Sequence, residues 1–253
     1  IKKSGPDWLV RAWLDGDWNI APGAFFEGVW DPQAHIVEPF EIPLEWKRWK
    51  SYDHGYKSPA GCVWFTQDYD GIIYIYRERY WSSKPNKGSE SPIEDIARDI
   101  NDAEDVERKL KIKFRSNVAD SAIFMRDGRH KSVADVFADY GVMWESSAKG
   151  PGSRVQGLQE IVDRLANNSL KVFSTCKHWL RTVPSLPADT KKIEDIDTKA
   201  EDHLFDATRY GLMLRRARSI KPKPKDKGPK PFTMEWLDKI DELFERDDPW
   251  PII

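Results

Sequence analysis

Three successive strands are predicted by residues 46–79, which read WKRWKSYDHGYKSPAGCVWFTQDYDGIIYIYRER. The first strand, Trp46–Asp53, ends in a His-Gly turn, and the second, Gly61–Thr66, is a short apolar run typical of a buried strand. An Asp-Gly turn at 70–71 precedes the third strand, Ile72–Arg79. Because short connections join neighbouring strands, this stretch predicts an antiparallel meander.

Strands and helices alternate after the meander. Helices are predicted over residues 92–110, 133–140, 155–166, 176–183 and 202–218, and strands over 114–120, 142–145 and 171–174. A meander followed by such alternation predicts an α/β fold in which a mixed central sheet is flanked by helices.

The composition is that of a soluble globular protein. Hydrophobic residues make up 40% of the 253 positions and charged residues 32%, and no window approaches the roughly 18 consecutive apolar residues of a membrane span. Cys62 and Cys176 are too few for a disulfide framework and indicate a reducing compartment. Because the net charge is only -2, any DNA contact requires basic groups that are gathered locally.

Three segments are predicted along the chain. Residues 1–45 are expected to be an entry segment, with prolines at 32, 39 and 43 marking an extended connection, and residues 46–219 are expected to form the main domain. Residues 220–253 are predicted to be a Lys/Pro-rich linker and a short tail helix. The chain starts with neither an initiator Met nor a signal peptide, so we expect a further segment to precede it.

Four aspartates lie at the boundaries of predicted elements. Asp53 ends the first strand, Asp120 ends the strand over 114–120, and Asp202 and Asp206 lie one turn apart on the last helix. Convergent carboxylates repel one another unless a cation lies among them, and their hard oxygen atoms suit Mg²⁺ or Mn²⁺. The chain has 42 acidic residues, so a single acid at a strand end is ordinarily a turn former. The order of the four along the chain is what indicates a catalytic metal site.

Basic residues predict a DNA contact in one loop. Lys149 and Arg154 flank Gly150-Pro151-Gly152, which leads into the N-terminus of a predicted helix. Side-chain charge and unpaired backbone N–H groups in such a loop favour a DNA phosphate, although an ordinary solvated loop is an equal alternative. Lys84 and Lys87 are weaker candidates for the same role.

Several motifs resemble those of the nuclease domains of phage terminase large subunits. Tyr52-Asp53-His54-Gly55 and Val118-Ala119-Asp120-Ser121-Ala122 resemble the first two acidic motifs of that family, and residues 202–210, DHLFDATRY, resemble its closing signature. The entry segment around Trp13–Trp18 resembles the exit of the terminase ATPase domain. Charges at Lys47, Arg48 and Lys50 depart from the apolar central strand of the family.

The resemblance implies an RNase H-like fold and a two-metal endonuclease that cuts concatemeric double-stranded viral DNA during packaging. It implies that Asp53, Asp120 and Asp206 are catalytic ligands of two Mg²⁺ or Mn²⁺ ions, with Asp202 as a fourth acid. It also implies a viral protein of the host cytoplasm that works with a portal ring, a small terminase subunit and an upstream ATPase domain. The chain has no Gly-x-x-x-x-Gly-Lys-Ser/Thr stretch, so we expect no ATPase site within it.

Two other functions remain open on the sequence. Another RNase H-like DNA enzyme, such as a junction resolvase or a transposase, would share the acids but would not account for the entry segment or the Lys/Pro-rich linker. A non-catalytic module that docks DNA or a portal ring would leave the four acids without a role.

Overall fold

The computed structural model describes residues 23–216, apart from 127, 129, 130, 148, 149, 151, 190, 191, 193 and 194. Residues 1–219 form one unit and residues 220–253 another, so every described residue belongs to the first unit. The predicted linker and tail helix over 220–253 therefore lie outside the described residues, as do the first 22 residues of the entry segment.

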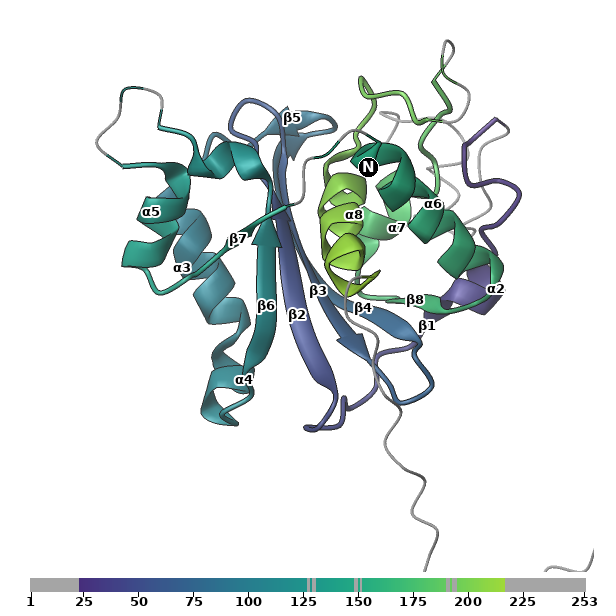
Figure 1. Ribbon diagram of the computed structural model, residues 1–253, viewed down its shortest axis with the longest axis horizontal. Coiled ribbons are helices and arrows are strands. Elements are labelled where there is room, and N and C mark those ends of the chain that lie inside the picture. Colours follow the sequence, from purple (N-terminus) through teal and green to yellow (C-terminus); the bar gives the residue numbers. More distant parts are fainter. Residues whose placement is uncertain are drawn as a thin grey trace, which may run out of the picture. The chain divides into compact units, whose positions relative to one another are not determined.

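An eight-stranded mixed sheet runs through the described unit (Figure 1). Its strands are β1 (Ile36–Val37), β2 (Lys47–Asp53), β3 (Ala60–Gln67), β4 (Ile73–Lys84), β5 (Lys87–Gly88), β6 (Phe114–Ala119), β7 (Glu145–Ser146) and β8 (Leu170–Phe173). The strand order is β1-β8-β4-β3-β2-β6-β7, and β5 pairs with β4. As predicted, β2, β3 and β4 form an antiparallel meander, whereas β6 joins β2 and β8 joins β4 in parallel. The two terminal strands, β1 and β7, contain two residues each.

Helices cover both faces of the sheet. They are α2 (Pro32–His35), α3 (Ile93–Ala103), α4 (Asp105–Lys109), α5 (Val133–Asp139), α6 (Ser153–Ala166), α7 (Lys177–Thr182), α8 (His203–Arg216) and the 3₁₀ helix η1 (Ser121–Phe124). In Figure 1, α3, α4 and α5 lie on one side of the sheet and α6, α7 and α8 on the other. Among the described residues, no helix combines the length and the apolar character needed to cross a membrane.

Helix α8 lies close against β2 because two side chains of that strand bind its backbone. Trp49 Nε1 donates to the carbonyl of Gly211 at 3.0 Å, and Ser51 Oγ donates to the carbonyl of Ala207 at 2.5 Å. Trp49, Ser51 and Asp53 alternate along the strand and therefore share this face. The arrangement fixes the position of α8 relative to the end of β2.

The opposite face of β2 carries charges that are paired inside the protein. Lys50 Nζ lies 2.6 Å from Glu104 Oε1, and Arg48 Nη1 lies 3.4 Å from Glu107 Oε1. Arg77 of β4 also pairs with Glu107, at 2.9 Å. We call these five residues the buried charge cluster. Arg48 and Lys50, two of the three charges that depart from the family pattern, thus bind carboxylates of α4 and of the residue before it.

One predicted helix is divided in two. The sequence predicts a single helix over 92–110, but the structure separates α3 from α4 at Glu104, where the backbone leaves helical geometry at ψ 6°. The Glu104 carboxylate accepts hydrogen bonds from Lys50 and from Trp64 Nε1, at 2.6 and 2.7 Å. The apolar spacing over 92–110 does not reveal these bonds to the sheet. The prediction therefore missed the break at Glu104.

Part of the predicted entry segment is regular structure. Asp31 caps α2 by accepting the N–H of Gln33 at 2.9 Å, and Pro32 begins the helix, a position where its missing N–H costs nothing. β1 then pairs in parallel with β8, and Phe26 is completely buried in the core. The expectation of an extended connection is therefore corrected for residues 32–37, because apolar side chains beside the prolines pack onto the sheet.

Gly211→Ala is expected to lower the free energy of unfolding by about 1–2 kcal/mol, because overpacking a core costs up to about 3 kcal/mol and helix propensity offsets about 1 of it. A Cβ atom there would lie 2.4 Å from Phe65 Cε2 and 3.0 Å from Ser51 Oγ, so α8 would have to move. Urea denaturation measures the difference, and Gly28→Ala, which meets nothing within 4 Å, is the matched control. Equal stability of Gly211→Ala and the wild type would contradict the packing described here.

Candidate active site

The four predicted aspartates lie where β2, β6 and α8 end or begin. Asp53 is the last residue of β2, and Asp120 follows β6, with its N–H donating to the carbonyl of Tyr52 at 3.0 Å. Asp206 lies in the first turn of α8, and its N–H donates to the carbonyl of Asp202 at 2.8 Å. We call Asp53, Asp120, Asp202 and Asp206 the acidic cluster.

The other carboxylates of the acidic cluster act electrostatically on Asp53 and on Tyr210. The pKa of Asp53 is raised from 3.8 to about 7, mainly by burial, with the charges of Asp206 and Asp120 adding to the rise and the hydrogen bond from His203 opposing it. Burial also raises the pKa of Tyr210, with added contributions from Asp53, Asp206 and Asp120. Asp120 and Asp206 act on both groups, and the pairing of Tyr52 with Ala119 and the bond from Ser51 to Ala207 bring the ends of β2 and β6 and the start of α8 together.

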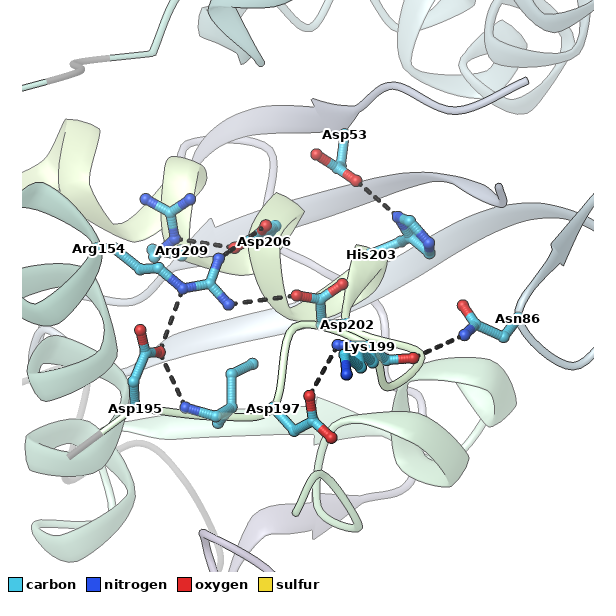
Figure 2. Close-up of polar contacts among 11 residues, drawn as sticks. Asp53, Asn86, Arg154, Asp195, Asp197, Lys199, Asp202, His203, Asp206 and Arg209 are labelled. Carbon is cyan, nitrogen blue, oxygen red and sulfur yellow. Dashed lines mark hydrogen bonds and ion pairs between the residues drawn. The ribbon is translucent and has the colours of Figure 1, made fainter. Parts of the chain in front are cut away.

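His203 holds Asp53 in place. Its Nδ1 lies 3.0 Å from Asp53 Oδ2, and Figure 2 shows the two side chains directed toward each other. Burial lowers the pKa of His203, but the hydrogen bond and charge of Asp53 outweigh it, so the pKa of His203 lies above 6.5. Both shifts favour a proton held between Asp53 and His203 beside the end of β2.

Arg154 binds the carboxylates on the other side of the cluster. Its guanidinium lies 3.1 Å from Asp206, 3.2 Å from Asp202 and 3.1 Å from Asp195 (Figure 2). Arg209 also pairs with Asp206, at 3.0 Å. Side chains of the protein thus neutralise part of the acidic cluster. The predicted DNA contact of Arg154 stays a prediction, and its partner in this structure is carboxylate.

Of the remaining predicted site residues, Asp120 is described by the structure and Lys149 is not. Asp120 caps η1, because its side chain accepts the N–H of Ala122 at 3.2 Å. Lys149 lies outside the described residues. Sequence reasoning missed Asp195 and Tyr210 as members of the site, since neither occupies the end of a predicted strand or the start of a helix. The Arg-Tyr pair that closes the DHLFDATRY stretch was the available signal for Tyr210.

The carboxylate oxygens of the acidic cluster suit a hard divalent cation, although the carboxylates do not form a complete coordination site. Carboxylate oxygens of the acidic cluster are the ligands that Mg²⁺ and Mn²⁺ prefer. Among the residues that the structure describes, no three His, Cys, Asp or Glu side chains are grouped closely enough to hold an ion. Asp53 is bonded to His203 and Asp206 to two arginines, so ion binding requires these carboxylates to exchange partners.

At pH values above neutral, Asp53→Asn is expected to raise the thermal midpoint of the metal-free protein. Folding raises the pKa of Asp53 from 3.8 to about 7, so the folded state takes up a proton between these values and loses stability as the pH rises through them. Asn does not titrate, so its advantage is largest above about pH 7 and shrinks toward about pH 4. Thermal scans in EDTA measure it, with the exposed turn residue Asp70→Asn as control. If the thermal midpoint of Asp53→Asn at about pH 8 is no higher than that of the wild type, burial does not raise the pKa of Asp53 as described.

The chain is similar to large terminases in sequence. It is 26% identical over 201 residues to the terminase large subunit of Salmonella phage P22, an alignment that covers 75% of this chain and 36% of that protein. The chain therefore spans about a third of the length of the curated relative that it matches. No protein-family model matches the chain.

Solved structures show the same fold. The P22 large terminase nuclease domain has a TM-score of 0.57 at 22% identity, with 77% of this chain and 93% of that chain covered. The large terminase nuclease of the thermophilic phage G20c with bound magnesium has a TM-score of 0.51 at 10% identity, with 76% and 98% covered. These findings confirm the resemblance to the terminase nuclease domain and the predicted RNase H-like fold with its mixed sheet.

Proposed function

We propose that this chain is the nuclease domain of a phage terminase large subunit and cuts concatemeric double-stranded DNA during genome packaging. The observation that carries the proposal is the convergence of Asp53, Asp120 and Asp206 from β2, β6 and α8. Asp53 is buried at the point where Asp120 and Asp206 approach it, and a bound cation that acts on phosphodiesters would offset the repulsion among these carboxylates. The likeness to large terminases supports this function over a resolvase or transposase.

Divalent ions are the proposed cofactors, with Asp53, Asp120 and Asp206 as ligands and Asp202 as a supporting acid. Two Mg²⁺ or Mn²⁺ ions held by these residues would supply activation of water and stabilisation of the leaving oxygen of a phosphodiester. The G20c nuclease, which was solved with bound magnesium, supports the use of a divalent metal. In the metal-free protein His203 holds Asp53 and Arg209 holds Asp206, and both carboxylates would exchange these partners for an ion.

The proposed protein context follows from the relatives. Large terminases are longer than this chain, so we propose that an ATPase domain precedes the nuclease fold, with the part of residues 1–45 that lies before the sheet as the connection and 220–253 as a linker and tail. Its proposed partners are double-stranded DNA, the portal ring and the small terminase subunit, in the cytoplasm of the host.

A cleavage assay tests this function. The purified chain is incubated with Mn²⁺ and three substrates: supercoiled plasmid, linear duplex and a four-way junction. We expect cleavage of plasmid and linear duplex without preference for the junction, and none in EDTA. Preference for the junction would instead favour a resolvase. Absence of cleavage with every substrate would favour a non-catalytic docking module.

A further inference from the structure

The β4–β5 hairpin extends beyond the sheet at the end where the acidic cluster lies. Asp53 pairs with Gly61 of β3, and Gly61 pairs with Tyr80 of β4, so these three residues are in register. β4 continues for four residues past Tyr80, to Lys84, and β5 folds back along it. At a strand rise of ~3.3 Å per residue, Lys84 lies about 13 Å beyond the level of Asp53 along the strand.

Two other segments are fastened to this hairpin. The N–H of Gly88 donates to the carbonyl of Lys57 at 2.8 Å, and a Cβ on Gly88 would lie 2.1 Å from the carbonyl oxygen of Tyr56. Asn86 Nδ2 donates to the carbonyl of Lys199, three residues before Asp202, at 2.9 Å (Figure 2). The loop after β2, the hairpin and the segment before α8 are thereby held together.

Each of these segments carries exposed lysine. Lys57, Lys84, Lys87 and Lys199 are all exposed, and none of them forms an ion pair within the described residues. Of the acids close to them along the chain, Glu90 is exposed, Asp197 accepts the backbone N–H of Lys199 at 2.9 Å, and Glu201 is paired with Arg181 at 2.6 Å. A protein with a net charge of -2 therefore gathers four exposed lysines, none of them in an ion pair among the described residues, in segments that border its acidic cluster. We call these four residues the hairpin lysines.

We propose that the hairpin lysines bind backbone phosphates of duplex DNA several nucleotides away from the acidic cluster. The proposal rests on the nuclease function above and specifies how the substrate is held. Four carboxylates repel the DNA backbone, so affinity has to come from positive charge placed to one side. At ~3.4 Å per nucleotide along one strand, the offset of about 13 Å corresponds to about four phosphates. Contacts of this kind fix the register of DNA without reading its sequence.

Salt titration of DNA binding tests the proposal without requiring catalysis. Anisotropy of a fluorescein-labelled linear duplex is measured in EDTA for the wild type and for Lys84→Gln/Lys87→Gln. Each lost phosphate contact lowers the slope of log K against log [salt] by about 0.9, so we expect a decrease of about 2 and about tenfold weaker binding at low salt. The matched control is Lys111→Gln/Lys113→Gln, which removes the same charge from exposed residues just before β6, at the opposite end of the sheet.

The outcomes separate this inference from the proposed function. A reduced slope in the hairpin variant, with a wild-type slope in the control, supports the hairpin lysines. Equal losses in the two variants, or none in either, would overturn the inference even if the wild type cuts duplex DNA in Mn²⁺. Failure of the wild type to bind or cut any duplex would instead overturn the nuclease function itself. Thermal midpoints of both variants are measured first, to show that each is folded.

Discussion

Asp53→Asn is expected to lower Mn²⁺-dependent cleavage of plasmid DNA by about 10³-fold or more, which corresponds to a loss of about 4 kcal/mol of transition-state stabilisation. The substitution keeps the size of the side chain but removes the charge that attracts a divalent ion. Asp120→Asn is expected to have an effect of the same order, since its carboxylate acts on the same region from β6. Initial rates of plasmid nicking measure both.

Two controls make this result specific to the acidic cluster. Asp70→Asn removes a carboxylate from an exposed turn and should cut DNA at the wild-type rate. Circular dichroism of Asp53→Asn and Asp120→Asn should match the wild type, because neither change alters packing volume. Cleavage at the wild-type rate by both folded variants would refute the assignment of the site.

Glu107→Ala is expected to destabilise the protein by about 3–5 kcal/mol. Glu107 is 2% exposed and pairs with Arg48 and Arg77, and it also accepts a hydrogen bond from Tyr76. Removing it leaves buried guanidinium charge without a partner, which costs far more than the pair itself contributes. The effect is measured as a shift in the midpoint of chemical denaturation.

The control for this prediction lies on the same helix. Asp105 of α4 pairs with Lys109 at 2.6 Å, but its side chain is 45% exposed, so Asp105→Ala should cost no more than about 1 kcal/mol. The double variant Arg48→Met/Glu107→Leu tests the cause, because it removes two charges together and should recover part of the lost stability. Similar losses for Glu107→Ala and Asp105→Ala would contradict the role of burial.

Much of the fold was predictable because its signals are local. The meander follows from two turns and a continuous apolar run, and Asp53 and Asp120 follow from their places at strand ends. Since β2 and β6 are parallel, those strand ends meet at one edge of the sheet. The predicted convergence of these acids therefore needed only the strand order as additional information.

What the sequence did not reveal depends on contacts between distant residues. Arg154 reaches Asp206 across 52 positions, and Lys50 reaches Glu104 across 54, so no local pattern identifies either pair. The same holds for the short strand β7, which the sequence places over 142–145 and the structure places at Glu145–Ser146. Its position is set by pairing with Val118 and Ala119 of β6 rather than by its own composition.

The two-residue length of β1 and β7 has a consequence for how concentrated solutions of this protein behave. Strands at the margins of a sheet are templates on which a foreign strand adds, and the number of unpaired N–H and C=O groups sets how strongly it is held. Two residues offer too few such groups to recruit a neighbour, so fibrillar aggregation by strand addition at these two ends is disfavoured.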